Sequence, residues 1–191
     1  MVIGLAGGVG SGKSRVAKML KRRGAEIVDA DALGHRALDR PEVRRRLVQA
    51  WGPGILRGKR IDREALARAA FGSRASVKRL NRIVHPAIIQ EMRRRLALRR
   101  GWTVLDAALL YEAGADRLCD RVIFVDAPLG LRIRRTGGRG WPPGELERRE
   151  RFQWIVAYKK KKADYVLVNT GSLSRTEQQL DKILDDLRRT I

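Results

Sequence analysis

The sequence predicts an α/β fold of three layers, in which a parallel five-stranded sheet lies between helices. Two observations support this prediction. Short apolar runs alternate with helix-like segments along the chain, which is the order expected of a parallel sheet. The first run also leads into a glycine-rich loop followed by a helix. The 191 residues, 43% of them hydrophobic, suit one domain with a buried core. No apolar run is long enough to span a bilayer, so no membrane partner is expected.

The glycine-rich loop, residues 7–14, matches G-x-x-x-x-G-K-[ST] at every fixed position. Residues 2–6 before it are typical of a buried strand, and residues 14–23 after it of a helix. The backbone N–H groups of such a loop, together with the positive end of the helix, bind phosphates. We expect Lys13 to reach the β- and γ-phosphates and Ser14 to ligate Mg²⁺. The predicted nucleotide-binding residues of this segment are Gly8, Val9, Gly10, Ser11, Gly12, Lys13, Ser14 and Arg15.

The second predicted strand, residues 25–29, is followed closely by Asp31. Open α/β sheets bind ligands just beyond the carboxyl ends of their strands. Asp31 can therefore accept a proton from a substrate hydroxyl, or hold Mg²⁺ through water. The alternative is that Asp31 only caps a helix beginning at Ala32. The phosphate loop favours the functional interpretation.

Residues 41–100 contain no obvious strand and are predicted to form a helical block. Helices are expected over residues 41–51, 62–71, 76–84 and 86–100. Asp62 is expected to cap the second of them, and Pro86 to start the last. A helical block between two strands of an α/β core suggests a substrate-covering subdomain. His85 lies at one of its joints, where it either caps the next helix or contacts substrate.

The third and fourth predicted strands cover residues 102–106 and 121–126. The third ends in Asp106, as the second nucleotide motif of phosphate-loop enzymes ends in an acid. Asp106 can hold the Mg²⁺ shell or lie near the substrate. The alternative is that Asp106 caps a helix that follows it.

Residues 131–162 are predicted to form a mobile lid. An arginine-rich helix after Pro128 leads to a glycine-rich break, and a second helix is expected over residues 145–162. Arg135 and Arg139 would reach the transferring phosphoryl oxygens, stabilise their charge and exclude water. The alternative is a solvated pair of basic helices.

The fifth predicted strand, residues 165–169, ends in a turn near the expected position of a bound base. A C-terminal helix capped by Ser174 follows. Its inward stripe should be Leu180, Ile183, Leu184 and Leu187. The predicted organisation is a core of residues 1–40, 101–130 and 163–191, a subdomain of about 41–100, and a lid of about 131–162.

The charge is strongly positive, with 42 Lys and Arg against 21 Asp and Glu, a net +21. A positive active site explains part of the excess. The remainder is either solvated helix faces or a polyanion-binding surface. Few aromatic residues interleave with the basic clusters, so a nucleic-acid partner is not expected.

The small number of histidine and cysteine residues indicates which kind of metal the protein could bind and which cellular compartment suits it. Two histidines and one cysteine cannot form an ordinary zinc site, so a hard metal bound by oxygen is expected. The single cysteine excludes an internal disulfide and fits a reducing, cytoplasmic compartment. Met1 leads directly into the first strand, so no signal peptide is expected.

These motifs together resemble those of the dephospho-CoA kinase family over essentially the full length. The elements that carry the resemblance are the segment 4–14, D-A-D at 29–31 with His35, His85-Pro86, Leu105-Asp106 with Glu112, Arg135 and Arg139, Arg149 with Gln153, and A-D-Y-V at 163–166 with Asn169 and Gly171. The resemblance implies a P-loop kinase fold and ATP- and Mg²⁺-dependent phosphorylation of the ribose 3′-hydroxyl of dephospho-CoA. That reaction gives CoA and ADP and is the last step of coenzyme A biosynthesis.

The resemblance also implies roles for single residues. Asp31 is the candidate base, with Lys13 and Arg139 as its catalytic partners. Ser14 and Asp106 are the candidate metal ligands. Arg135 and Asn169 are expected to contact the nucleotide. The residues expected to contact dephospho-CoA are His35 and His85, together with Asp31 and Asp106, which thus have two expected roles each.

The chain departs from the family pattern at four positions. Arg15 stands in place of Thr, Ala108 in place of Pro, Gly140 in place of Asp, and Arg132 where Gln is commoner. None of these changes removes a predicted phosphate ligand.

Two other functions remain as hypotheses. One is another small-molecule kinase, for nucleosides or nucleotides, and the other is a nucleotide-dependent nucleic-acid-binding protein. A monomer or small homo-oligomer is expected.

Overall fold

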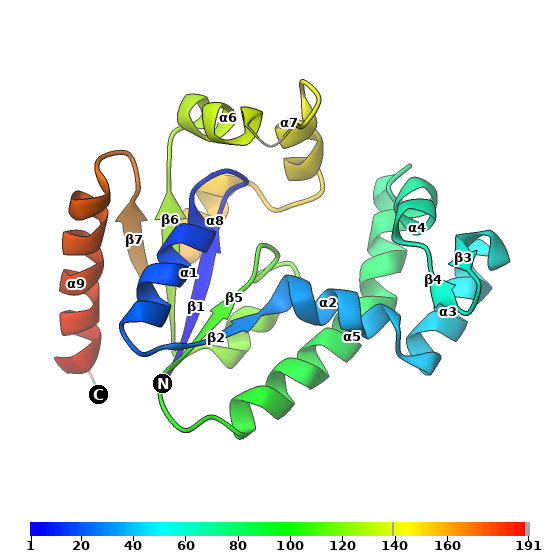
Figure 1. Ribbon diagram of the computed structural model, residues 1–191, viewed down its shortest axis with the longest axis horizontal. Helices are drawn as coiled ribbons and strands as arrows, with labels where there is room; N and C mark the ends of the chain where they lie inside the picture. Colours follow the sequence, from blue (N-terminus) through cyan, green and yellow to red (C-terminus); the bar gives the residue numbers. More distant parts are fainter. Residues whose placement is uncertain (139, 190–191) are drawn as a thin grey trace. The chain divides into compact units, whose positions relative to one another are not determined.

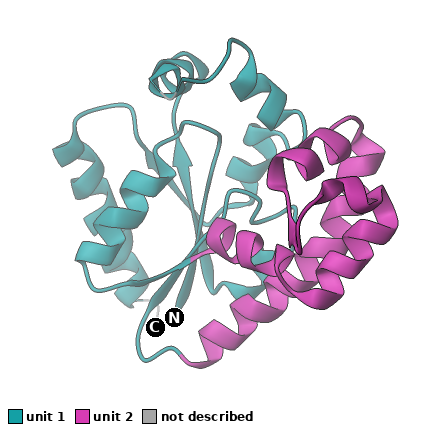
Figure 2. Ribbon diagram, turned by 45° about the vertical axis from the view of Figure 1, so that its right-hand side comes forward, with its two compact units in different colours: residues 1–28, 99–191 teal, residues 29–98 magenta. Residues whose placement is uncertain are grey.

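The computed structural model describes residues 1–138 and 140–189, and the chain divides into two compact units. Residues 1–28 and 99–191 form the first, here called the core unit, and residues 29–98 form the second, the helical unit (Figure 2).

A parallel five-stranded sheet forms the centre of the core unit, as the sequence predicts (Figure 1). Its strands are β1 (Val2–Gly7), β2 (Glu26–Asp29), β5 (Thr103–Asp106), β6 (Arg121–Asp126) and β7 (Tyr165–Val168), in the order β2-β5-β1-β6-β7. The central strand β1 is wholly buried and pairs with β5 through Leu5 opposite Asp106. This register brings the end of β5 beside the start of the glycine-rich loop.

Helices cover both faces of this sheet. They are α1 (Lys13–Arg22), the 3₁₀ turn η2 (Ala115–Leu118), α6 (Leu129–Gly137), α7 (Glu145–Glu150), α8 (Val156–Lys162) and α9 (Leu173–Arg189). Side chains of α1 and α9, including Met19 and Leu184, share one apolar cluster with Leu5 of the sheet. Helix α8 packs against β1 and β6, and Figure 1 shows it behind the sheet from α1. The three-layer α/β fold is therefore confirmed.

The expectation of one helix over residues 145–162 is wrong. The helix ends at Glu150 and a second begins at Val156. The Trp154 N–H donates to Glu112 Oε1 over 2.8 Å, so a distant side chain takes a donor that a continuous helix would use. The cap of α9 also differs from the expected Ser174, because Ser172 Oγ accepts the Arg175 N–H. The inward stripe of α9 is confirmed, with Leu180, Leu184 and Leu187 buried and Ile183 partly buried.

The helical unit contains four α-helices, a 3₁₀ turn and a two-stranded hairpin among its residues 29–98. The elements are α2 (Ala30–Leu38), α3 (Pro41–Trp51), η1 (Pro53–Ile55), β3 (Leu56–Arg57), β4 (Arg60–Ile61), α4 (Arg63–Ala70) and α5 (Arg74–Ala97). The short hairpin was not expected from the sequence. As predicted, Asp62 caps α4, accepting the N–H groups of Glu64 and Ala65.

The expected helix boundary at Pro86 is wrong, because α5 runs through this proline. Proline removes one helical hydrogen bond and normally kinks or ends a helix. Here buried side chains lie on both sides of it, among them Ile83, Val84 and Met92. Packing of this long apolar stripe against α2, α3 and α4 outweighs the lost hydrogen bond. His85 therefore lies inside a helix, and the hypothesis that it caps one is wrong.

Candidate active site

The glycine-rich loop has the predicted strand–loop–helix geometry, between β1 and α1. Gly10 and Gly12 have φ values of 77° and 92°, in the left-handed region that favours glycine. Gly12 caps α1, so the amides of the first turn face the loop without a side-chain cap. Such unpaired N–H groups at a helix N-terminus form an anion-binding site.

Lys13 and Asp106 meet at this loop. The Lys13 ammonium forms an ion pair with Asp106 Oδ1, and the two side chains are 15% and 13% exposed. No helix follows Asp106, because residues 108–114 form turns. The alternative that Asp106 caps a helix is therefore wrong. The structure brings the predicted phosphate-binding cation and the predicted acid into contact, although they lie 93 positions apart.

Arg135 and Asn169 also reach the loop, but they bind its main chain. Arg135 donates to Ser11 O over 3.0 Å and to Asn169 O over 2.9 Å. The Asn169 amide donates to Ser11 O over 2.7 Å and is almost wholly buried. Burial and the charge of Arg15 lower the pKa of Arg135 from its ordinary value. In this structure both residues hold the loop in shape.

Arg132 and Glu150 form a second contact with the loop, which the sequence analysis missed. Glu150 Oε1 accepts the Val9 N–H over 3.0 Å and an Arg132 N–H over 2.5 Å. Arg132 also donates to Val9 O over 3.2 Å. The only sequence signal was that Arg132 departs from the family pattern.

Lys159 and Glu112 form a buried ion pair that sequence reasoning also missed. The ammonium lies 2.6 Å from Glu112 Oε1, with side chains 1% and 8% exposed. Lys159 also donates to Gln153 Oε1 and Ala108 O. The pair joins α8 to the segment that follows β5, next to Asp106 in the chain. The signal in the sequence is a run of four lysines, residues 159–162, and such a run by itself indicates a solvated helix face.

We expect Lys159→Ala to lower the free energy of unfolding by about 3–5 kcal/mol, because it leaves the buried Glu112 carboxylate without its counter-charge. Urea unfolding followed by circular dichroism measures the change. The matched control is Lys161→Ala, which removes an exposed lysine from the same helix and should change stability by less than about 0.5 kcal/mol. Equal losses in the two variants would contradict a structural role for this pair.

The helical unit carries three further predicted site residues. Asp29, not Asp31, caps α2, since Asp29 Oδ1 accepts the N–H groups of Asp31 (2.9 Å) and Ala32 (3.0 Å). The alternative that Asp31 caps a helix beginning at Ala32 is therefore wrong. Asp31 lies in the first turn of α2, and His35 follows four positions later, on the same face of that helix. His85 is in α5. Arg139 lies outside the described residues.

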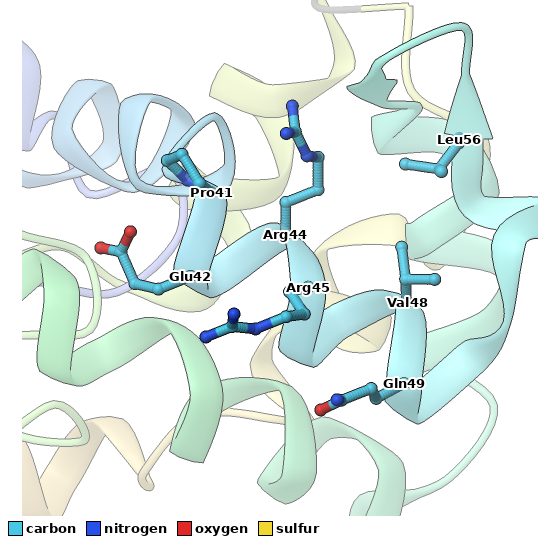
Figure 3. Close-up of a pocket in the computed structure, with 7 residues that line it drawn as sticks. All are labelled: Pro41, Glu42, Arg44, Arg45, Val48, Gln49 and Leu56. Carbon is cyan, nitrogen blue, oxygen red and sulfur yellow. The ribbon is translucent and has the colours of Figure 1, made fainter.

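A cavity of about 570 Å³ opens on α3 of the helical unit (Figure 3). Its lining residues are Pro41, Glu42, Arg44, Arg45, Val48, Gln49 and Leu56, which include none of the predicted site residues. The Arg44 guanidinium donates to Lys59 O over 2.6 Å, so it fixes the nearby hairpin.

Neither a membrane span nor a preformed metal cluster is found in the described part of the chain. Across residues 1–138 and 140–189, no helix is both long and apolar enough to cross a bilayer. The same residues contain no group of three or more His, Cys, Asp or Glu side chains placed to hold a metal.

The single cysteine of the chain, Cys119, is not a candidate nucleophile. Burial raises the pKa of its thiol to about 12, which makes a reactive thiolate unfavourable there.

Comparisons with known proteins identify a family whose members resemble this chain over most of its length. A family model described as dephospho-CoA kinase matches residues 1–175. The dephospho-CoA kinase of Deinococcus radiodurans is 40% identical over 193 residues, covering 98% of this chain and 93% of that protein. The enzyme of the same name from Geobacillus kaustophilus is 40% identical over 192 residues, covering 96% and 95%.

Solved structures show the same fold. A Thermus thermophilus protein has a TM-score of 0.84 at 36% identity, covering 98% of this chain and 97% of that one. A dephospho-CoA kinase from Campylobacter jejuni has a TM-score of 0.69 at 22% identity, with coverage of 99% and 98%. A shikimate kinase from Acinetobacter baumannii has a TM-score of 0.56 at 16% identity, with coverage of 97% and 93%. The last two similarities support the fold alone.

Proposed function

The chain belongs to the dephospho-CoA kinase family, and from this we propose that it transfers the γ-phosphoryl group of ATP to the ribose 3′-hydroxyl of dephospho-CoA. The products are CoA and ADP. The observation that carries the proposal is the contact between Lys13 and Asp106 at the glycine-rich loop. A phosphate-binding cation and an acid at the end of the neighbouring strand are the parts that phosphoryl transfer requires.

The triphosphate would bind to the loop amides that follow Val9, whose own N–H is donated to Glu150, and to the first turn of α1. Lys13 would then exchange the Asp106 carboxylate for phosphate oxygens. Ser14 and Asp106 offer hard oxygen donors, which fit Mg²⁺. The ion, when bound, supplies charge neutralisation on the β- and γ-phosphates. Arg135 and Asn169 would act on the nucleotide indirectly, because they hold the main chain of the loop at Ser11.

Asp31 is proposed as the base that accepts the proton of the ribose hydroxyl. Its capping alternative has been removed, because Asp29 performs that role. His35 and His85 are proposed to contact dephospho-CoA, and Arg139 to stabilise charge on the transferring group.

The predicted organisation gives each segment a task. We propose that residues of about 41–100 cover the dephospho-CoA, and that α6 and α7, within the predicted lid of about 131–162, exclude water during transfer. We also propose that the protein works in the cytoplasm as a monomer or small homo-oligomer.

A coupled ADP-release assay with a panel of acceptors tests this function. The panel holds dephospho-CoA, adenosine, AMP, shikimate and gluconate, each with ATP and Mg²⁺. We expect kcat/KM to be largest for dephospho-CoA, with the product phosphorylated at the 3′ position by mass spectrometry and NMR. Folded protein that turns over a nucleoside or nucleotide faster would establish a different small-molecule kinase.

A further inference from the structure

We propose that Arg132 and Glu150 form a charge-neutral clamp on Val9 that sets the phosphate loop for ATP. This inference rests on the proposed function, because it concerns how the same loop receives its nucleotide. Arg132 and Glu150 act here as positioning residues, through the main chain of Val9. Figure 1 shows their helices, α6 and α7, beyond the carboxyl ends of the strands.

The clamp fixes the loop on both sides of one residue. Glu150 Oε1 accepts the Val9 N–H over 3.0 Å, and Arg132 donates to Val9 O over 3.2 Å. The two side chains join each other over 2.5 Å. The peptide groups before and after Val9 therefore cannot rotate without breaking a charged hydrogen bond, which is stronger than a neutral one.

The clamp lies directly against the loop. A Cβ atom added at Gly8 would come within 2.9 Å of Arg132 Nη1 and 3.0 Å of Glu150 Oε1. One added at Gly10 would come within 2.7 Å of the Arg132 carbonyl oxygen. The side chains of Arg132 and Glu150 are only 7% and 19% exposed, so solvent screens their charges weakly.

The charge balance of the clamp follows from this position. A carboxylate at the edge of a phosphate site repels the triphosphate, and the adjacent guanidinium cancels that repulsion. The Arg132 Nε is buried with no hydrogen-bond partner within the described residues. Burying an unsatisfied donor costs free energy. The ion pair with Glu150 offsets this cost, because Arg132 neutralises the charge of the Glu150 carboxylate.

The proposal predicts opposite signs for the two single variants, measured as the ATP dissociation constant by isothermal titration calorimetry. Arg132→Gln leaves an uncompensated carboxylate and should weaken ATP binding about 10-fold or more. Glu150→Gln keeps an acceptor for the Val9 N–H and leaves a positive charge, so ATP should bind as tightly as to the wild type or tighter. The double variant is neutral again and should return to within about threefold of the wild type.

Steady-state kinetics separate this role from simple support of the fold. Arg132→Gln should raise the KM for ATP more than it lowers kcat, because the lost interaction acts on the bound triphosphate. Arg148→Gln is the matched control. It removes the same charge from α7, but that arginine is 68% exposed and pairs with Glu145. It should change the ATP dissociation constant less than about twofold.

If the wild-type protein binds and uses ATP, either of two results would overturn the proposed clamp. One is equal weakening by both single variants, and the other is a double variant no better than Arg132→Gln. Thermal unfolding of each variant is measured in parallel. If Glu150→Gln does not fold, the comparison of Arg132→Gln with Arg148→Gln decides alone, and equal ATP dissociation constants for these two variants would overturn the clamp. A folded wild type that binds no ATP would overturn the proposed function, and the clamp with it.

Discussion

Asp31→Asn is expected to lower the turnover of dephospho-CoA by about 10²-fold or more, while ATP binding stays nearly unchanged. The amide keeps the size of the side chain but cannot accept the hydroxyl proton. The variant leaves the cap of α2 in place, because Asp29 rather than Asp31 accepts the capping N–H groups. Steady-state kinetics in both substrates, with calorimetric ATP titration, measure the two quantities.

The matched control is Asp29→Asn, the same change two positions earlier. Asparagine is as good an N-cap as aspartate, so α2 should remain stable. Because the exchange of one good cap for another costs little stability, turnover should stay within about a few-fold of the wild type. Equal loss of turnover in the two variants, or loss of ATP binding in Asp31→Asn, would remove Asp31 from the role of base.

Lys13→Ala is expected to damage nucleotide handling, lowering kcat/KM for ATP by about 10²–10³-fold. The ammonium neutralises phosphate charge, and its loss also leaves the Asp106 carboxylate unpaired beside the triphosphate. ATP binding should therefore weaken together with turnover, in contrast to Asp31→Asn. Calorimetric titration and initial rates at varied ATP concentration test this result.

Lys18→Ala provides the control for Lys13→Ala. Lys18 is an exposed lysine on the same helix, α1, so its removal changes the net charge equally. It should leave kcat/KM for ATP within about twofold, since exposed charges contribute little through solvent. If both lysine variants lost ATP affinity to the same extent, a general charge effect would replace the assigned contact.

The parts of the fold that the sequence predicts well are those with local causes. The strand, glycine loop and helix at residues 2–22 depend on one contiguous motif, and all three are found. The cap at Asp62 likewise depends on its immediate neighbours. Each of these assignments needs only the chemistry of a few adjacent residues.

The parts that were missed depend on partners distant in the chain. Helix α5 passes through Pro86 because its apolar stripe packs against three other helices. The break between α7 and α8 depends on Glu112, 42 positions before Trp154. The pairing of Arg132 with Glu150 required knowing that both helices reach the loop. Spacing along one sequence does not reveal such contacts. Lys13 and Asp106 were each predicted from a motif of phosphate-loop enzymes, but the ion pair between them was not predicted.

The bonds from Arg135 and Asn169 to Ser11 have a consequence for synthesis of the protein. The ribosome makes the glycine-rich loop before the two residues that donate to the Ser11 carbonyl oxygen, which follow it by more than a hundred positions. A nascent chain halted before position 169 lacks the last of these supports. We therefore expect the loop to gain its full set of supporting hydrogen bonds only after the fifth strand has been made and has joined the sheet.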